Sequence, residues 1–428
     1  MHGTRTMRRT LTAVIAAAIV VGAGAVAIEP AGAANAPVTG VTAKEIKVGA
    51  IVGKTNPTGV PYEDVVTGAQ ARFDAQNKKG GIYGKQLKVV KTYDDQTRAS
   101  KDIEAARALT EEDKVFAAIV ATQSFSGADV LAKAGTPTFG MNIQFDWSKG
   151  PNLFGTYGSY NCPDCPSFSP AYSALKAGAK RMAIFAYGSS PSSSDCAGAI
   201  KNAADRWGPK VAVFDTSLSF GFSANDVSGA VQAMKDNQVD FVATCMDLQG
   251  ELNLSKALQA AGVTGTQFYA PQGYDTETIK QLGTQLNGFT LPIQFVPFEL
   301  AKGNPGMTEF IKAMKARGLD PTENLLVGWV GASLLIEGLQ KAGKSFTQAS
   351  VVDAINQITD WNANGMIAKV NWQHEHGPAQ PGDVGCFAYV IAKDGKFVPV
   401  YGQPGKPLVC FPGNPYPANL DTPTYEGA

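Results

Sequence analysis

Two cysteines separated by two residues form the most reactive pattern in the sequence. Cys162 and Cys165 stand in Cys-Pro-Asp-Cys, a spacing that thiol–disulfide oxidoreductases use for a reactive pair. Such a pair normally opens a helix in a βαβ unit, whereas this one lies in residues 157–166, which are crowded with Gly, Pro and Asn. We therefore interpret the pair as a structural disulfide and keep a thiol–disulfide oxidoreductase as an alternative function.

The remaining candidates for catalysis are weak. The chain has 3 histidines, and only His374 and His376 lie beyond the N-terminal segment. His374-Glu375-His376 lacks the helical spacing of a zinc site, and we interpret it as a solvated turn. No glycine-rich phosphate loop or glycosidase-like carboxylate pair stands out. We therefore expect no enzymatic activity, no metal and no cofactor.

Polar residues follow two apolar segments that are expected to be neighbouring strands. Phe116–Val120 is a continuous apolar run, typical of a strand buried on both faces of a parallel sheet. Pro137–Phe139 is a second, shorter strand. Ligands of open α/β sheets bind outside the carboxyl ends of the strands. Gln123, Ser124 and Asn142 are therefore predicted to share one rim of a binding site.

A helix is expected to begin just after the first of these strands, near Gly127. Backbone N–H groups at its start, around Ser126, would favour an anionic ligand group. The alternative is that Ser124 or Ser126 serves only as the helix cap. The residues alone leave both interpretations open.

The elements that must position these side chains alternate along the chain. Buried strands are expected at Ile46–Gly53 and Arg181–Tyr187, among others, with helices such as Tyr62–Lys78 and Asn324–Ala342 between strands. This alternation predicts βαβ units and a parallel sheet. The pattern restarts after Cys162, so we expect two successive α/β lobes. A chain of 428 residues is also too long for one ordinary core.

The N-terminus has the composition of a signal peptide over residues 1–33. Arg5, Arg8 and Arg9 precede the apolar segment Leu11–Ile28, and Ala31-Gly32-Ala33 provides small residues at a cleavage site. An uncleaved anchor is the alternative, because the apolar run approaches membrane thickness. No cysteine precedes Cys162, so no lipid attachment is expected. The predicted location is therefore exported, either periplasmic or extracellular.

Charge and cysteine content agree with an exported protein that binds no nucleic acid. Basic and acidic residues number 37 each, so the chain lacks the excess of positive charge that nucleic-acid binding requires. Six cysteines in an exported chain indicate disulfides, and sequence alone permits fifteen pairings. Placement in the expected elements favours three pairs: Cys162–Cys165, Cys196–Cys245 and Cys386–Cys410.

The order of several segments resembles the type I periplasmic binding proteins, specifically the branched-chain amino-acid-binding (leucine/isoleucine/valine-binding-like) family of ABC importers. The segments are IKVGAIVG, GGIYGKQLKVVKTYDDQ, EEDKVFAAIVATQS, AGTPTFG, YAPQGYD and AKDGKFVPV. The resemblance implies two doubly wound parallel-sheet lobes joined by three crossovers, with a ligand cleft between them. The N-terminal lobe would comprise residues 45–156 and 297–345, and the C-terminal lobe residues 162–292 and 346–411. Residues 412–428 are expected to form a disordered tail.

The same resemblance implies ligand-binding positions in both lobes. In the N-terminal lobe they fall on Gln123, Ser124 and Asn142. In the C-terminal lobe they fall on Gln272 and Tyr274, with Asp247 at the end of the neighbouring strand. Amino-acid-binding members usually carry an acid where this chain has Gln272, which argues against an ordinary branched-chain amino acid. Asp247 would replace that acid, or it merely caps a helix.

The function implied is an extracytoplasmic solute-binding protein. Such a protein captures a small polar organic solute and delivers it to the membrane permease of an ABC importer. It is expected to act as a monomer. A ligand-sensing receptor domain of the same fold is the alternative.

Overall fold

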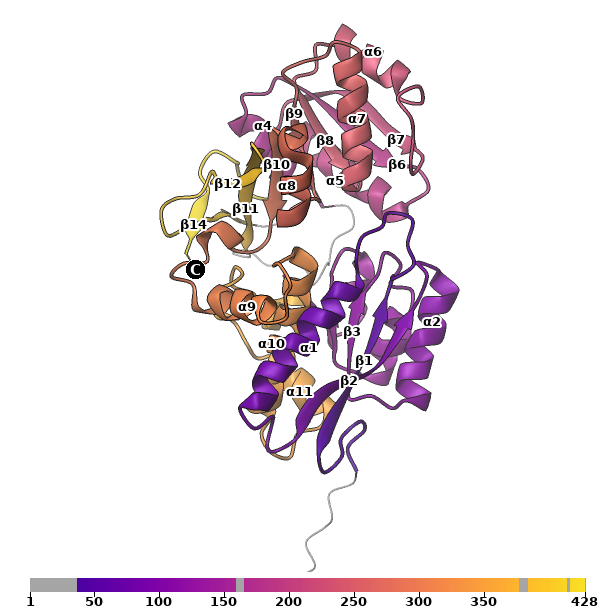
Figure 1. The fold of residues 1–428 in the computed structure, drawn as a ribbon, viewed down its shortest axis with the longest axis vertical. Coiled ribbons are helices and arrows are strands. Elements are labelled where there is room, and N and C mark those ends of the chain that lie inside the picture. Colours follow the sequence, from indigo (N-terminus) through magenta and orange to yellow (C-terminus); the bar gives the residue numbers. More distant parts are fainter. Residues whose placement is uncertain (1–36, 159–164, 377–383, 414–415, 428) are drawn as a thin grey trace, which may run out of the picture. The chain divides into compact units, whose positions relative to one another are not determined.

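Two open sheets, each wound in the same strand order, dominate the structure. The structure is a computed structural model that describes residues 37–158, 165–376, 384–413 and 416–427 (Figure 1). The first sheet has 5 strands in the order β2-β1-β3-β4-β5, and all of its pairings are parallel. The second contains the parallel run β7-β6-β8-β9-β10, followed by antiparallel β11, β13 and β14, with β12 paired to β11.

The order 2-1-3-4-5 thus occurs twice, as the repeated strand–helix pattern predicts. We call the lobe built on the first sheet the N-terminal lobe and the lobe built on the second sheet the C-terminal lobe. The elements of the first sheet and its helices are β1 (Glu45–Val52), α1 (Glu63–Lys78), β2 (Gln86–Asp94), α2 (Ala99–Arg107) with a π-helical turn (Ala108–Glu112), β3 (Ala117–Ala121), α3 (Ala128–Ala134), β4 (Thr138–Gly140), a 3-10 turn (Phe145–Ser148) and β5 (Leu153–Gly155).

The C-terminal lobe follows. The chain then returns to the N-terminal lobe and finally re-enters the second sheet, where it ends. The elements in chain order are α4 (Phe168–Lys176), β6 (Arg181–Tyr187), α5 (Pro191–Trp207), β7 (Lys210–Leu218), α6 (Ser228–Asp236), β8 (Phe241–Cys245), α7 (Leu248–Ala260), β9 (Gln267–Tyr269), α8 (Thr276–Leu282), β10 (Phe289–Ile293), α9 (Pro305–Lys315), α10 (Glu323–Ala342), α11 (Gln348–Ile355), α12 (Trp372–Glu375), β11 (Val384–Lys393), β12 (Lys396–Val400), β13 (Leu408–Pro412) and β14 (Thr424–Glu426). Short 3-10 turns lie at Gly283–Leu286 and Phe298–Leu300.

The central strands of each sheet, such as β3, β6 and β8, are buried on both faces. Successive side chains of a strand point to opposite sides, so each face has its own core. In β6, Met182 and Ile184 pack with α4 and α5, whereas Ala183 and Phe185 pack into the core formed with α6 and α7. In the N-terminal lobe, α1 and α10 cover one face of the sheet and α2 covers the other (Figure 1). This explains why the central strands read as continuous apolar runs.

Helix α10 is the only described helix that is long and apolar enough to cross a membrane by length and composition. Most of it is buried against α1 and β4. Its place as a buried core helix therefore accounts for its apolar composition.

The position of α11 differs from the lobe boundary expected at residue 346. Helix α11 packs on α10, and the Gln348 amide donates to the carbonyl oxygens of Val115 and Phe116, at 3.3 and 2.9 Å. Asn356 donates to the carbonyl of Pro151. Residues 348–356 thus belong with the N-terminal lobe, and the return to the second sheet occurs later, at β11.

The C-terminal tail is also more ordered than expected. Strand β14 pairs antiparallel with β13, and Cys410 lies opposite Thr424 in the register. Leu420 is buried against the aromatic core of the C-terminal lobe. The expectation of a disordered tail over residues 412–428 is therefore wrong for the part described, because a sheet edge and an apolar contact hold it.

Candidate functional site

The turn after β3 is closed by its own hydrogen bonds. The Thr122 hydroxyl accepts from the backbone N–H of Ser124 at 3.1 Å, and the Ser124 and Ser126 hydroxyls lie 3.1 Å apart. Helix α3 begins after Gly127, and within the described part of the chain no side-chain hydrogen bond caps it. Neither serine therefore serves as its cap, and the partly exposed Ser124 hydroxyl remains at the rim.

The backbone N–H groups at the start of α3 are largely engaged. The Gly127 N–H donates to the Asp102 carboxyl group, and the Ala128 N–H donates to the carbonyl of Phe125. The anion site expected from N–H groups around Ser126 thus loses these two donors. The hydroxyls of Ser124 and Ser126, both half-buried, are polar groups that remain on this turn.

Gln123 connects the β3 turn with the turn after β1. Its side-chain amide donates to the Thr58 hydroxyl at 3.2 Å, and it also hydrogen-bonds the side chain of Tyr62. Burial is the main reason that the pKa of Tyr62 is raised to about 12, and Asp95 and Asp247 raise it further. Gln123 therefore lies on the predicted rim but is already held by two polar neighbours.

The turn after β4 brings a second amide to the same edge of the sheet. Asn142 donates to the carbonyl of Gly158 at 2.8 Å, and Gln144, which is buried, donates to the carbonyl of Thr122 at 2.7 Å. Gln144 thus links the β3 and β4 turns, which places Gln123, Ser124 and Asn142 at one edge of the sheet, and their shared ligand contact stays a prediction.

Two buried acids accept hydrogen bonds from the turn after β3. Asp95, just after β2, accepts from the Thr122 hydroxyl and from the Thr97 N–H, the latter at 2.9 Å. Asp102 on α2 accepts from Gly127. Both carboxyl groups are fully buried. They join the ends of β2 and α2 to the two ends of the β3 turn.

In the C-terminal lobe, Asp247 is held by its own helix and by a tyrosine. One carboxylate oxygen, Oδ1, caps α7 by accepting from the Gln249 and Gly250 N–H groups at 2.9 and 3.2 Å. The other, Oδ2, accepts from the Tyr187 hydroxyl at 2.7 Å. The cap interpretation of Asp247 is confirmed. Its predicted ligand contact stays a prediction, with both oxygens already engaged.

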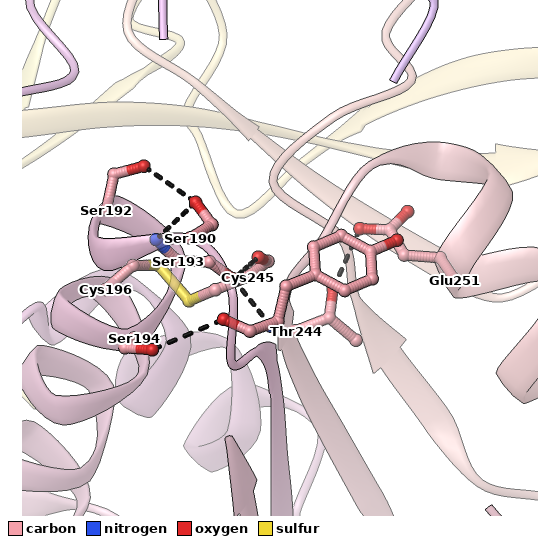
Figure 2. The surroundings of a disulfide bond; sticks show 9 residues. Ser190, Ser192, Ser193, Ser194, Cys196, Thr244, Cys245 and Glu251 are labelled. Atoms are coloured by element: carbon pink, nitrogen blue, oxygen red, sulfur yellow. Dashed lines mark hydrogen bonds between the residues drawn. A yellow bond between two sulfur atoms is a disulfide. The ribbon is translucent and has the colours of Figure 1, made fainter. Parts of the chain in front are cut away.

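A disulfide and a buried acid fix the strands that carry this pair. Figure 2 shows Cys196 of α5 bonded to Cys245 at the end of β8, beside Ser193, whose hydroxyl donates to the Cys245 carbonyl at 2.5 Å. The Ser193 hydroxyl also accepts from the Tyr187 N–H. Glu251 is fully buried and accepts from Thr244, and burial raises its pKa well above the ordinary value.

Replacing Tyr187 with phenylalanine is expected to reduce the free energy of unfolding by about 1.5–3 kcal/mol, since a buried hydrogen bond to a carboxylate is lost. Urea denaturation followed by circular dichroism measures this. Tyr157→Phe is the matched control, because the Tyr157 hydroxyl is buried and has no partner among the described residues. Equal losses in the two variants would contradict the assigned role of the Tyr187–Asp247 bond.

Gln272 and Tyr274 follow β9 but occupy different environments. Gln272 is partly exposed, and its amide makes no hydrogen bond to the part of the chain that the structure describes. Tyr274 is buried between Phe298 and Phe397. Its hydroxyl donates to Glu299 at 2.6 Å and accepts from the Phe298 N–H at 2.7 Å. The ligand contacts predicted for Gln272 and Tyr274 stay predictions, with the Tyr274 ring buried and its hydroxyl already hydrogen-bonded.

The histidine segment is not the solvated turn that its composition indicated. Residues Trp372–Glu375 form the short helix α12, and the His376 ring stacks on Trp372 and contacts Phe154 edge-on. Burial lowers the pKa of His376 to about 4. Among the described residues, the one cluster with metal-ligand geometry is Cys386, Cys410 and Glu426, and both of its cysteines are in a disulfide.

Two of the three predicted disulfides are confirmed. Cys196 is bonded to Cys245, and Cys386 to Cys410, which face each other across β11 and β13. Cys165 is also disulfide-bonded, but its predicted partner Cys162 lies outside the described residues. The signal peptide predicted over residues 1–33 also lies outside the described residues.

Two hollows on the described surface lie away from the predicted site. One, of about 520 Å³, is bordered by Gln267, Phe268 and Phe289, at the amino ends of β9 and β10. The other, of about 230 Å³, lies between α1 and α10 beside Arg72 and Trp329. Ligands of this fold bind at the carboxyl ends of the strands, so neither hollow is the candidate site.

Sequence reasoning missed the residues that support the rim. The sequence analysis gave no role to Asp95, Asp102, Thr122, Tyr62 and Gln144. A signal was present for Asp102, because it stands three and four residues before the buried Ala105 and Ala106 and therefore on the buried side of α2. An acid at such a position needs a local reason to be there.

The comparisons with known proteins agree on one fold. A family model described as "Periplasmic binding protein" matches residues 45–395. No curated protein matches the chain in sequence. The leucine-binding protein LivK of Thermotoga maritima has a similar structure, with 18% identity and a TM-score of 0.67 over 83% of this chain and 97% of that one.

Two further solved structures carry a bound ligand. The substrate-binding protein LivJ of Streptococcus pneumoniae, in complex with isoleucine, matches with 16% identity and a TM-score of 0.66 over 83% of this chain and 100% of its own. A solute-binding protein of an ABC transporter from R. palustris, in complex with benzoate, matches with 20% identity and a TM-score of 0.65 over 83% and 95%. At these identities the likeness establishes the fold.

Proposed function

The chain belongs to the periplasmic binding protein family, and we propose that it captures a small polar organic solute between its two lobes and delivers it to the permease of an ABC importer. The observation that carries the proposal is the repeated 2-1-3-4-5 strand order, with polar side chains beyond the carboxyl ends of the strands in both sheets. Ser124 and Asn142 would contact the solute from one lobe, and Gln272 from the other. The protein itself would catalyse no reaction.

Export accompanies this role. Removal of the signal peptide near Ala33 would release the protein outside the cytoplasm, where the disulfides Cys196–Cys245 and Cys386–Cys410 are stable. No observation favours the receptor-domain alternative over transport.

The ligand class follows from the charges at the rim. A buried ammonium group needs a paired carboxylate, because leaving it unpaired is costly. Gln272 carries no charge, and both oxygens of Asp247 already accept hydrogen bonds. Gln272 and Ser124 suit a carboxylate or another acceptor-rich group. The relative that binds benzoate shows that this fold accepts an acid without an ammonium group.

We expect small organic acids to stabilise the protein, and leucine, isoleucine and valine to have no effect. A ligand at a hundredfold excess over its Kd adds about 2.7 kcal/mol to the free energy of unfolding. A thermal-shift screen of organic acids, including benzoate, amides and amino acids measures this. Micromolar binding of a branched-chain amino acid that Asp247→Ala abolishes would contradict the ligand class and assign the ammonium site to Asp247. A screen without any hit would count against solute binding.

A further inference from the structure

Two buried acids hold opposite ends of the turn on which the proposed ligand contact Ser124 lies. Asp95 accepts from the Thr122 hydroxyl at the start of the turn, and Asp102 accepts from the Gly127 N–H at its end. The Thr122 hydroxyl in turn accepts from the Ser124 N–H. The backbone position of Ser124 therefore depends on both carboxyl groups.

The two carboxyl groups lie within hydrogen-bonding reach of each other. Each perturbs the other through a side-chain contact, and neither takes part in an ion pair among the described residues. Asp102 Oδ2 is buried and accepts no hydrogen bond from the residues that the structure describes. Two ionised carboxylates offer only acceptors to one another, so this contact is satisfied only when one group carries a proton.

We propose that Asp95 and Asp102 are positioning residues that share one proton and thereby hold the 122–127 turn in its ligand-binding conformation. Asp102 is the member that carries the proton. It donates through Oδ2 to Asp95, while its Oδ1 keeps accepting from Gly127. Asp95 remains the acceptor for Thr122 and Thr97. This inference deepens the proposed function and rests on it for the role of Ser124 in binding.

The charges around the pair favour retention of the proton. Burial, the Asp95 charge and the Asp146 charge raise the pKa of Asp102, to about 8, against the hydrogen bond from Gly127. Burial raises the pKa of Asp95, and Asp94 adds to this. Lys149, which follows the 3-10 turn that carries Asp146, is paired with Asp146 and Asp129 at 2.8 and 3.0 Å. Two buried negative charges without a cation are unfavourable.

The proton should be lost as the pH rises through about 8, and the turn should then loosen. Asp102→Asn supplies the same hydrogen bonds without a titratable proton, because its oxygen accepts from Gly127 and its N–H₂ donates to Asp95. Asp102→Ala removes both. The first variant therefore mimics the protonated pair at every pH, and the second lacks it at every pH.

Amide hydrogen exchange of the ligand-free protein between pH 6 and 9.5 tests this, read on peptides that cover residues 122–127 and corrected for the intrinsic pH dependence. In the wild type we expect protection of this segment to fall at least tenfold across pH 8. Asp102→Asn should keep its protection throughout, and Asp102→Ala should lack it at pH 6. Asp113→Asn, which removes a carboxylate bonded to Tyr93 in the same lobe, should follow the wild type.

Identical pH profiles for the wild type and Asp102→Asn would overturn the shared proton. If Asp102→Ala fails to fold, the comparison of wild type with Asp102→Asn still decides the question, because the isosteric variant keeps the packing. The exchange experiment uses no ligand. A protein that binds no solute would therefore fail the thermal-shift screen and still pass this test, so the two proposals fail separately.

Discussion

Replacing Cys196 and Cys245 together with serine is expected to lower the free energy of unfolding of the C-terminal lobe by about 4 kcal/mol. The disulfide joins residues 49 apart in sequence, and its removal restores chain entropy to the unfolded state. In the folded state it links α5 to the end of β8 beside the Ser193 bond to the Cys245 carbonyl (Figure 2). A loss of this size is a large part of the stability of a typical domain.

Guanidinium denaturation of the oxidised variant measures the change. The Cys386–Cys410 pair provides a comparison, because it joins residues only 24 apart on strands that also pair through their backbones. Serine at both of those positions should cost less, about 3.4 kcal/mol, because the loop that this disulfide closes is shorter. A Cys196→Ser/Cys245→Ser variant as stable as the parent would show that the disulfide does not constrain the lobe.

Alanine in place of Gly328 is expected to destabilise the N-terminal lobe by about 3 kcal/mol. Helices α1 and α10 approach so closely that a methyl group at Gly328 would overlap the carbonyl oxygen of Val65. Gly68 makes the reciprocal approach to the carbonyl of Leu325. Because backbone atoms are in the way, the two helices must move apart, and the sheet face they cover would lose packing.

Gly198→Ala is the matched control for this variant. Gly198 lies inside α5, and a methyl group there would meet no atom within 4 Å. Alanine at this position should therefore raise the free energy of unfolding by about 0.5–1 kcal/mol, because alanine has the higher helix propensity. Thermal unfolding of the two variants under the same conditions gives both values. A Gly328→Ala protein that gains stability, as Gly198→Ala should, would contradict the close helix contact.

Segments with local signals were predicted well from the sequence. Strand β6 was expected at Arg181–Tyr187 and lies there, because an apolar run bounded by turns has few other solutions. The lobe to which α11 belongs was not predicted correctly. Its assignment to the N-terminal lobe depends on the contact of Gln348 with Phe116, which is far away in the sequence. The tail failed for the same reason: its Pro- and Gly-rich composition hides the pairing of β14 with β13.

The candidate site was predicted at the level of strand ends but not of hydrogen bonds. The rule that ligands bind beyond the strands placed Gln123, Ser124 and Asn142 together. It does not show which donors are already occupied. The engagement of Tyr274 by Glu299, and that of Gly127 by Asp102, depend on side-chain contacts that no local pattern encodes.

The central claim is that one solute contacts Ser124 in the N-terminal lobe and Gln272 in the C-terminal lobe. Calorimetry with the organic acid that gives the largest thermal shift tests it directly, on the wild type, Ser124→Ala and Gln272→Ala. Each lost hydrogen bond to a charged ligand group should weaken binding by about 1.5–3 kcal/mol, which is roughly 10- to 150-fold in Kd. Unchanged Kd values in both variants, with binding retained, would contradict a site between the two lobes.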